Sequence, residues 1–192
     1  MNLLAHLFPK ARAEVLRLVI GEPERELHLR DISRLAGLTP ATLQKELANF
    51  TSAGLVTARR DGNRLYFRAN AQHPAYPELH GLVLKTAGPV PKLADALTNV
   101  DGIDAAFVFG SIAAGTDTAD SDIDVMVLGS VGLRKITAAF RGLSSSLGRE
   151  VNPHCLTPTE WHRRLAADDA FIRRVAAEPK LWLKGGPNAV TR

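Results

Sequence analysis

Apolar residues recur at helical spacing in the first part of the chain. Residues 14–20 and residues 30–36 each place their apolar side chains on one face, as an amphipathic helix does. Thr39 and Pro40 then form a strong helix start, because threonine caps the first turn and proline suits the first helical position. The pattern predicts a helix from Pro40 to about Ala53, and two helices joined by a short turn make a helix-turn-helix.

Two runs of alternating apolar and polar residues follow this predicted helix. Residues 55–60 and 64–68 are rich in β-forming residues and flank Asp61-Gly62-Asn63, a typical hairpin turn. A helix-turn-helix followed directly by a hairpin is the order of elements in a winged helix. The sequence therefore predicts a winged helix-turn-helix in this part of the chain.

Residues 10–70 resemble the winged helix-turn-helix of small bacterial repressors of the arsenical-resistance type, most clearly in His28–Leu38 and Ala53–Val56. The resemblance implies binding to double-stranded DNA by a homodimer on a palindromic site. The residues expected to contact DNA lie on the predicted Pro40 helix and on the hairpin: Thr39, Thr42, Gln44, Lys45, Asn49, Arg59, Arg60, Asn63 and Arg64. The alternative is a solvated hairpin in a winged helix that makes only protein contacts. Arg68 could instead stack on Tyr66 or cap the domain boundary.

A second pattern begins after a segment rich in proline and glycine. The near-continuous apolar run Ile103–Phe109 predicts a buried central strand, which ends in Gly110-Ser111. After ten intervening residues, Asp122 and Asp124 open another predicted strand, and the one residue between them places both carboxylates on one face. Adjacent carboxylates suit a divalent ion such as Mg²⁺, which leaves other positions to phosphate and water. A glycine followed by a serine lets a phosphate approach the backbone.

Residues 92–155 resemble the minimal nucleotidyltransferases of the DNA polymerase β superfamily, which share this Gly-Ser and Asp-x-Asp spacing. The resemblance implies that Gly110 and Ser111 hold the triphosphate of a nucleotide, with ATP as the expected one. It also implies that Asp122 and Asp124 bind Mg²⁺ and orient the nucleotide. The family uses a third carboxylate on a neighbouring strand, both as a metal ligand and as a base.

The position of this third carboxylate is open in the sequence. Residues 149–156 read as the neighbouring strand, and its natural register places Asn152 where the family has an acid. Glu150 lies two residues earlier and therefore on the same face. Either Glu150 acts as the third catalytic and metal-binding residue, or the carboxylate is missing. A surface ion pair of Glu150 with Arg149 or Arg134 is the alternative.

Several other residues are given structural roles. Residues 131–147 are predicted to form one helix, and Thr157 with Glu160 is predicted to form a capping box. His154 shares a strand face with Glu150 but is expected to be structural, and Cys155 is expected in the core. Asp120 is expected on or beside the metal site.

The charge is divided unevenly along the chain. The net charge is +4, and residues 1–86 hold twelve basic against eight acidic residues, so all of the surplus lies there. A basic N-terminal segment is typical of a domain that binds a polyanion. The sequence predicts an α+β chain with a winged helix-turn-helix in residues 1–86 and a nucleotidyltransferase-like mixed sheet flanked by helices in residues 87–192. With one cysteine, no long apolar run and no secretory leader, a cytoplasmic protein without a membrane partner is expected.

Three functions fit these features. The first is a DNA-binding transcriptional regulator whose second domain binds Mg-nucleotide or transfers a nucleotidyl group. The second is an active nucleotidyltransferase that modifies a partner protein, a tRNA or a small molecule, as in toxin–antitoxin pairs, with the winged helix as adaptor. The third is a degenerate nucleotidyltransferase that serves as sensor or scaffold, which the amide at Asn152 motivates.

Overall fold

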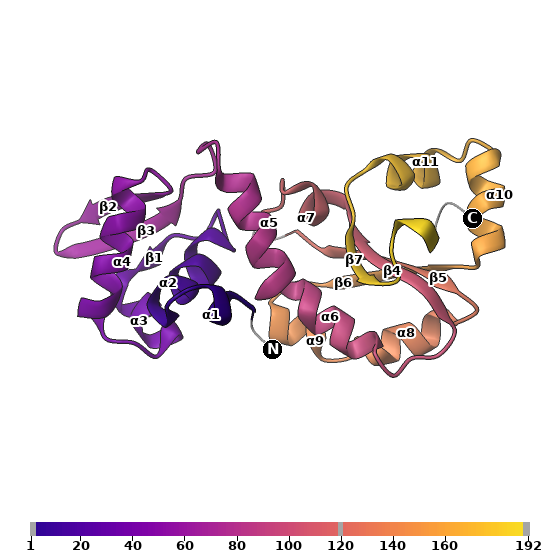
Figure 1. Ribbon diagram of the computed structural model, residues 1–192, viewed down its shortest axis with the longest axis horizontal. Helices are drawn as coiled ribbons and strands as arrows, with labels where there is room; N and C mark the ends of the chain where they lie inside the picture. Colours follow the sequence, from indigo (N-terminus) through magenta and orange to yellow (C-terminus); the bar gives the residue numbers. More distant parts are fainter. Residues whose placement is uncertain (1–2, 119–120, 190–192) are drawn as a thin grey trace. The chain divides into compact units, whose positions relative to one another are not determined.

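The chain forms two compact units. The structure, a computed structural model, describes residues 3–118 and 121–189. The N-terminal unit comprises Met1–Gly88 and the C-terminal unit Pro89–Arg192, so the division falls at Gly88 where the sequence suggested residue 86 (Figure 1). Among the described residues, no helix is long and apolar enough to span a membrane.

The N-terminal unit packs helices against a small antiparallel sheet with strand order β1-β3-β2. Its elements are α1 (Leu3–Leu7), α2 (Lys10–Val15), the π-helical turn η1 (Leu16–Ile20), β1 (Leu27–His28), α3 (Leu29–Ala36), α4 (Pro40–Ser52), β2 (Val56–Asp61), β3 (Arg64–Ala69) and α5 (Tyr76–Thr86). The predicted helix at residues 14–20 is therefore split, since an α-helix ends at Val15 and wider turns continue it.

Local sequence signals set α4 in place. The Thr39 hydroxyl accepts a hydrogen bond from the Thr42 backbone N–H at 3.4 Å, and Pro40 occupies the first helical position. One side of the helix buries Leu43, Leu47 and Phe50 in the core of this unit. The predicted helix and its buried stripe are thus confirmed.

The predicted hairpin is also confirmed. β2 and β3 pair antiparallel from Val56↔Ala69 to Asp61↔Arg64. Gly62 in the turn has φ +56°, a left-handed conformation that glycine adopts without steric cost.

The C-terminal unit is built on a mixed sheet with strand order β6-β5-β4-β7, in which β5 and β6 are parallel and the other pairs antiparallel. Its elements are α6 (Pro89–Leu97), β4 (Ile103–Phe109), α7 (Gly110–Ala114), β5 (Ile123–Gly129), α8 (Leu133–Ala139), α9 (Leu143–Leu147), β6 (Val151–Leu156), α10 (Pro158–Ala166), α11 (Ala170–Ala177), β7 (Leu181–Lys184) and the 3₁₀ turn η2 (Pro187–Ala189).

Helices cover both faces of this sheet. Figure 1 shows α10 and α11 on one side and α6, α8 and α9 on the other. Trp161 and Ile172 of α10 and α11 pack with Phe107, Phe109 and Met126 in one buried cluster. The fold is a mixed α+β arrangement with a helix-flanked mixed sheet, as predicted for this part of the chain.

Two local predictions are wrong. The single helix expected at 131–147 is two short helices, because Gly142 between them has φ +83° and cannot continue an α-helix. The capping box forms only by half: Thr157 accepts from the Glu160 N–H at 3.1 Å. The Glu160 carboxylate binds Arg163 and Arg164 instead of returning to the cap, because charged donors form the stronger hydrogen bonds.

Candidate functional site

The backbone at Gly110 touches the acidic strand. Gly110 follows β4 and opens α7 with φ +72°, and a Cβ atom there would lie 2.9 Å from Asp124 Oδ2. The backbone conformation therefore favours glycine, and a side chain at this position would require the Asp124 carboxylate to move. The close approach brings Gly110-Ser111 and the Asp122–Asp124 pair, which are far apart in sequence, into one place.

The sheet register extends this site across three strands. Asp124 on β5 pairs with Phe109 on β4 and with Asn152 on β6, so the three residues form one row. Asp122 lies exposed just before β5, and Asn152 Nδ2 donates a hydrogen bond to its Oδ2 at 3.1 Å. Asn152 is thus within reach of the acidic pair, but as an amide that donates a hydrogen bond to Asp122.

The backbone of Glu150 lies next to the acidic pair. Its carbonyl oxygen accepts a hydrogen bond from the Ile123 N–H at 2.8 Å, which places Glu150 beside Asp122, and its side chain is exposed. Within the described ranges, no group of three or more histidine, cysteine or acidic side chains is gathered as for a metal. Asp122, Asp124 and Glu150 therefore do not form a closed three-carboxylate cluster here, and Asp120 lies outside the described residues.

A buried ion pair links the two segments that lead into the site. Arg149 binds Asp117 with an N–O distance of 2.9 Å, and their side chains are 13% and 0% exposed. Arg149 is therefore engaged with Asp117 rather than with its neighbour Glu150. The contact ties the loop before Asp122 to the start of β6.

The Asp124 carboxyl group is half-buried, and burial raises its pKa above the ordinary value. His154 and Arg174 lower this pKa through their electrostatic effect. Asp122 and Glu178 raise it further. A carboxylate in such surroundings favours a bound cation, because the cation offsets both its desolvation and the repulsion from its neighbour.

The donor set fits Mg²⁺. Two adjacent aspartates offer hard oxygen ligands, and Mg²⁺ commonly binds one or two carboxylates while phosphate and water complete its octahedron. The residues that would hold it are Asp122 and Asp124, with Glu150 beside them.

Helix α11 brings Phe171 and Arg174 to the site, and the sequence pattern does not assign either residue to it. The Phe171 ring lies 5.9 Å from that of Phe109 and 5.3 Å from that of His154. His154 is thus packed between aromatic rings, and Arg174 of the same helix acts electrostatically on Asp124. The amphipathic pattern of residues 170–177 predicts a helix, but no local signal says which strand end it covers.

The residues expected to contact DNA are all exposed on the N-terminal unit. They lie at the start of α4, along α4 and on the β2–β3 hairpin: Thr39, Thr42, Gln44, Lys45, Asn49, Arg59, Arg60, Asn63 and Arg64. The sheet arrangement thus places the hairpin residues and the α4 residues in one unit, with side chains open to solvent.

Two hairpin arginines bind acidic residues of the same unit. Arg59 forms two hydrogen bonds with Glu26, at 2.6 and 2.9 Å, and lies 5.2 Å above the Tyr66 ring. This contact lowers the pKa of Glu26. Arg68 donates to the Pro23 carbonyl oxygen at 3.1 Å and to Glu24 at 2.8 Å. Two nearby acceptors thus hold the Arg68 guanidinium group, and the arginine that lies over the Tyr66 ring is Arg59.

Comparison with known protein families identifies part of the C-terminal unit. Residues 91–152 match the family model "Polymerase beta, Nucleotidyltransferase". This segment is a nucleotidyltransferase-type domain. It includes Gly110, Ser111, Asp122, Asp124 and Asn152, the residues that the sheet brings together. No curated protein gives a significant match.

Solved structures give distant similarities. A crystal structure of a mutant of the toxin–antitoxin MntA-HpeT is 20% identical, with 52% of this chain and 76% of that chain covered and a TM-score of 0.40. A toxin–antitoxin structure with AMP-PNP is 22% identical, with 52% and 73% covered and a TM-score of 0.37. NolR from Sinorhizobium fredii is 22% identical, with 44% and 84% covered and a TM-score of 0.32. The family match to residues 91–152 is the stronger finding.

Proposed function

We propose that the C-terminal unit binds a magnesium–nucleoside triphosphate, ATP first, in a DNA-binding transcriptional regulator. The observation that supports the nucleotide site is the approach of the Gly110 backbone to Asp124. It places a turn open to phosphate against a carboxylate pair suited to Mg²⁺. Bound Mg²⁺ would offset the charge of the phosphates there.

In this proposal each residue has one role. The Gly110 and Ser111 backbone, with the Ser111 hydroxyl, donates hydrogen bonds to phosphate oxygens. The Asp122 and Asp124 carboxylates hold the metal ion. Asn152 donates to Asp122 and keeps that carboxylate oriented.

Calorimetric titration of the full chain with AMP-PNP and Mg²⁺ tests nucleotide binding. We expect binding that requires Mg²⁺ and falls by about tenfold or more in the double variant Asp122→Asn, Asp124→Asn, which loses both anionic ligands. Asp104→Asn is the matched control, because Asp104 is an exposed acid on β4 of the same unit. Equal affinity of the double variant and the wild type would rule out this site.

For the N-terminal unit we propose a winged helix-turn-helix that binds double-stranded DNA as a homodimer. The exposed polar residues of α4 would reach base edges, and Arg60 and Arg64 of the hairpin would contact phosphates or the minor groove. The confirmed α4 helix and hairpin, together with the positive charge of residues 1–86, support this. Arg59 would have to exchange Glu26 for DNA, so we assign it a smaller share.

A mobility-shift assay on the DNA upstream of the protein's own gene tests this half, with and without Mg-ATP. We expect the variant Arg60→Ala, Arg64→Ala to bind at least about tenfold more weakly. Arg25→Ala is a control, since Arg25 lies outside the hairpin and pairs with Glu22. If the wild type shifts neither this DNA nor mixed genomic fragments at low salt, the chain is not a DNA-binding regulator.

Nucleotidyl transfer to a protein, tRNA or small-molecule acceptor is the second candidate. The Glu150 backbone lies beside Asp122, which favours this candidate. The exposed Glu150 carboxylate would take the proton of a hydroxyl that attacks the α-phosphorus of the nucleotide, and pyrophosphate would leave. The test is transfer of label from α-labelled ATP to components of a cell lysate. Loss of labelling in Glu150→Gln with nucleotide binding retained would support transfer. Binding without any labelling by the wild type would leave a nucleotide sensor.

A further inference from the structure

Helix α11 connects the candidate site to Arg174, which has no part in the proposed nucleotide site so far. Phe171, in its first turn, contacts the rings of Phe109 and His154. Phe109 immediately precedes Gly110 and pairs with Asp124. One turn later, the guanidinium carbon of Arg174 lies 5.8 Å from the centre of the Phe171 ring. A chain of direct contacts thus leads from the site to Arg174.

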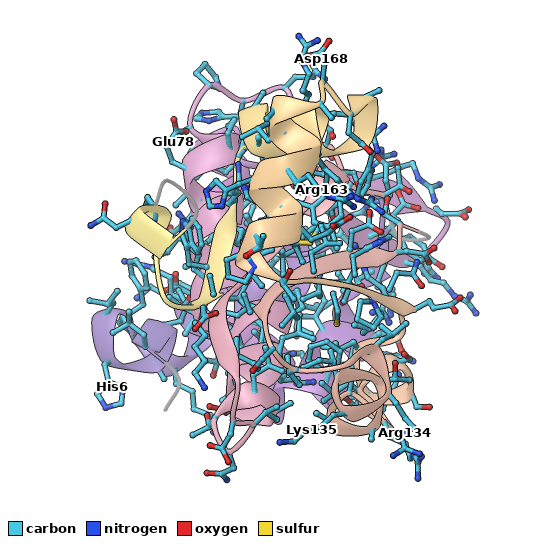
Figure 2. The ribbon with its side chains drawn as sticks, turned by 90° about the vertical axis from the view of Figure 1, so that its right-hand side faces the viewer. His6, Glu78, Arg134, Lys135, Arg163 and Asp168 are labelled. Atoms are coloured by element: carbon cyan, nitrogen blue, oxygen red, sulfur yellow. The ribbon has the colours of Figure 1, made fainter. Side chains whose placement is uncertain are left out.

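Arg174 forms the longest ion pair among the arginines of α10 and α11 when the shortest N–O distance of each is compared. Arg163 and Arg164 both bind Glu160, with N–O distances of 2.6 and 2.8 Å, and Arg173 binds Asp168 at 2.8 Å. Figure 2 labels Arg163 on α10 and Asp168, which lies in the turn before α11. Among the described carboxylates the one within ion-pair range of Arg174 is Glu178, at 3.9 Å, and the Arg174 side chain is 65% exposed.

The Arg174 side chain has room to change its conformation. Arg174 lines a depression of about 780 Å³ over α10 and α11 together with Leu165, Asp168 and Arg173, and Gly110, Ser111, Asp122 and Asp124 are not among its lining residues. Because its pairing with Glu178 is loose, at 3.9 Å, the guanidinium group can change direction with little cost in lost contacts. Arg173 lines the same depression but is held by Asp168.

The negative charge of the two aspartates and of a bound nucleotide favours a nearby cationic side chain such as that of Arg174. The helix α7 that follows Gly110 contains no basic residue. Arg174 is the described arginine whose charge lowers the pKa of Asp124. A nucleoside triphosphate would add about four negative charges to two aspartates, which one Mg²⁺ offsets only in part. Arginine suits the remaining charge, because its planar fork donates two parallel hydrogen bonds to a phosphate.

We propose that Arg174 binds a phosphate group of the nucleotide held by Gly110, Ser111, Asp122 and Asp124, leaving Glu178 to do so. This inference rests on the proposed function of the same site. It assigns to α11, outside the segment that matches the family model, a direct part in nucleotide recognition. It also implies that affinity depends on the number of phosphates, since adenosine offers Arg174 no partner.

Calorimetric titration with Mg²⁺ and AMP-PNP, and separately with adenosine, tests this inference. We expect Arg174→Gln to weaken binding of Mg-AMP-PNP by about tenfold or more, and binding of adenosine by less than about twofold. Arg173→Gln is the matched control, an adjacent exposed arginine, and should change both affinities by less than about twofold. Unfolding curves of both variants should match the wild type, because both side chains are exposed.

The outcomes separate the two proposals. If the wild type binds Mg-AMP-PNP and Arg174→Gln binds it equally well, Arg174 is not a phosphate ligand and the proposed function stands. If Arg173→Gln loses as much affinity as Arg174→Gln, the effect is the general positive field of α11 and the specific assignment is wrong. If the wild type binds no nucleotide, the proposed function itself fails.

Discussion

At the scale of single residues, Gly110 is the position where the backbone conformation and the proposed nucleotide site both restrict the choice of side chain. Its φ of +72° costs an L-residue about 1–2 kcal/mol, and a Cβ there would push against Asp124 Oδ2. Gly115 has the same φ of +72° with no atom within 4 Å of its hypothetical Cβ. The two glycines therefore separate backbone strain from contact with the acidic pair.

We expect Gly110→Ala and Gly115→Ala to lower the free energy of unfolding by a similar amount, about 1–2 kcal/mol, from the positive φ alone. Only Gly110→Ala should also weaken binding of Mg-AMP-PNP, by about tenfold, because its methyl group displaces the Asp124 carboxylate. Urea unfolding and calorimetric titration measure the two effects. If the two alanine variants bind the nucleotide equally well, Gly110 has no role beyond backbone conformation.

The Asp117–Arg149 pair is the second residue-scale constraint. Because the Asp117 side chain is fully buried, Arg149→Met leaves its charge without this partner and should cost about 3–5 kcal/mol of unfolding free energy. Arg163→Met is the control, since Arg163 is 73% exposed and its pairing with Glu160 should contribute at most about 1 kcal/mol. Urea denaturation of both variants measures the difference. Similar losses would mean that burial does not govern the strength of this pair.

At the scale of elements, helix starts were readable from sequence because they depend on adjacent residues. Thr39-Pro40 and Thr157-Pro158 each open a helix as expected, and the Asp61-Gly62-Asn63 turn forms its hairpin. Gly142 was missed as a helix break, because a glycine inside an amphipathic pattern is locally tolerated and only its positive φ ends the helix.

Thr157 gives a test of this local logic. Its hydroxyl accepts from the Glu160 N–H, so Thr157→Ala should lower the free energy of unfolding by about 1 kcal/mol. Thr159→Ala, an exposed change two residues later in the same helical turn, should be neutral or slightly stabilising because alanine favours helices. Thermal unfolding of the two variants provides the comparison. Equal stability of the Thr157 and Thr159 variants would show that the cap contributes nothing.

Contacts between distant elements explain what the sequence could not predict. The sequence indicates the spacing of Gly110-Ser111 and Asp122–Asp124 and the place of Asn152 on the neighbouring strand, which the register Asp124↔Asn152 confirms. The hydrogen bond from the Asn152 amide to Asp122 depends on the folded sheet, and no local pattern indicates it. The same holds for Arg174, which joins the site only because α11 packs on the face of the sheet that contains Phe109. The pairing of Arg59 with Glu26 joins residues 33 positions apart, so no local pattern indicates it.

At the scale of the whole molecule, charge is divided between the two units. Residues 1–86 hold the whole surplus of +4, while the remaining residues are balanced. If the N-terminal unit binds DNA through its hairpin, affinity must depend steeply on salt, because each neutralised phosphate releases condensed counterions. A nucleotide bound to the C-terminal unit would add negative charge to a unit that has no surplus of positive charge. That unit is therefore not expected to attract DNA.

This division predicts how salt and substitution act together. A plot of the logarithm of DNA affinity against the logarithm of salt concentration, measured by fluorescence anisotropy, should lose about 0.9 in slope for each phosphate contact removed. The variant Arg60→Ala, Arg64→Ala should therefore have a slope lower by about two, whereas Arg134→Ala, Lys135→Ala, which removes two exposed charges from α8 of the C-terminal unit (Figure 2), should leave it unchanged. Equal slopes for the two variants would mean that DNA is attracted by the net charge of the chain rather than by the hairpin.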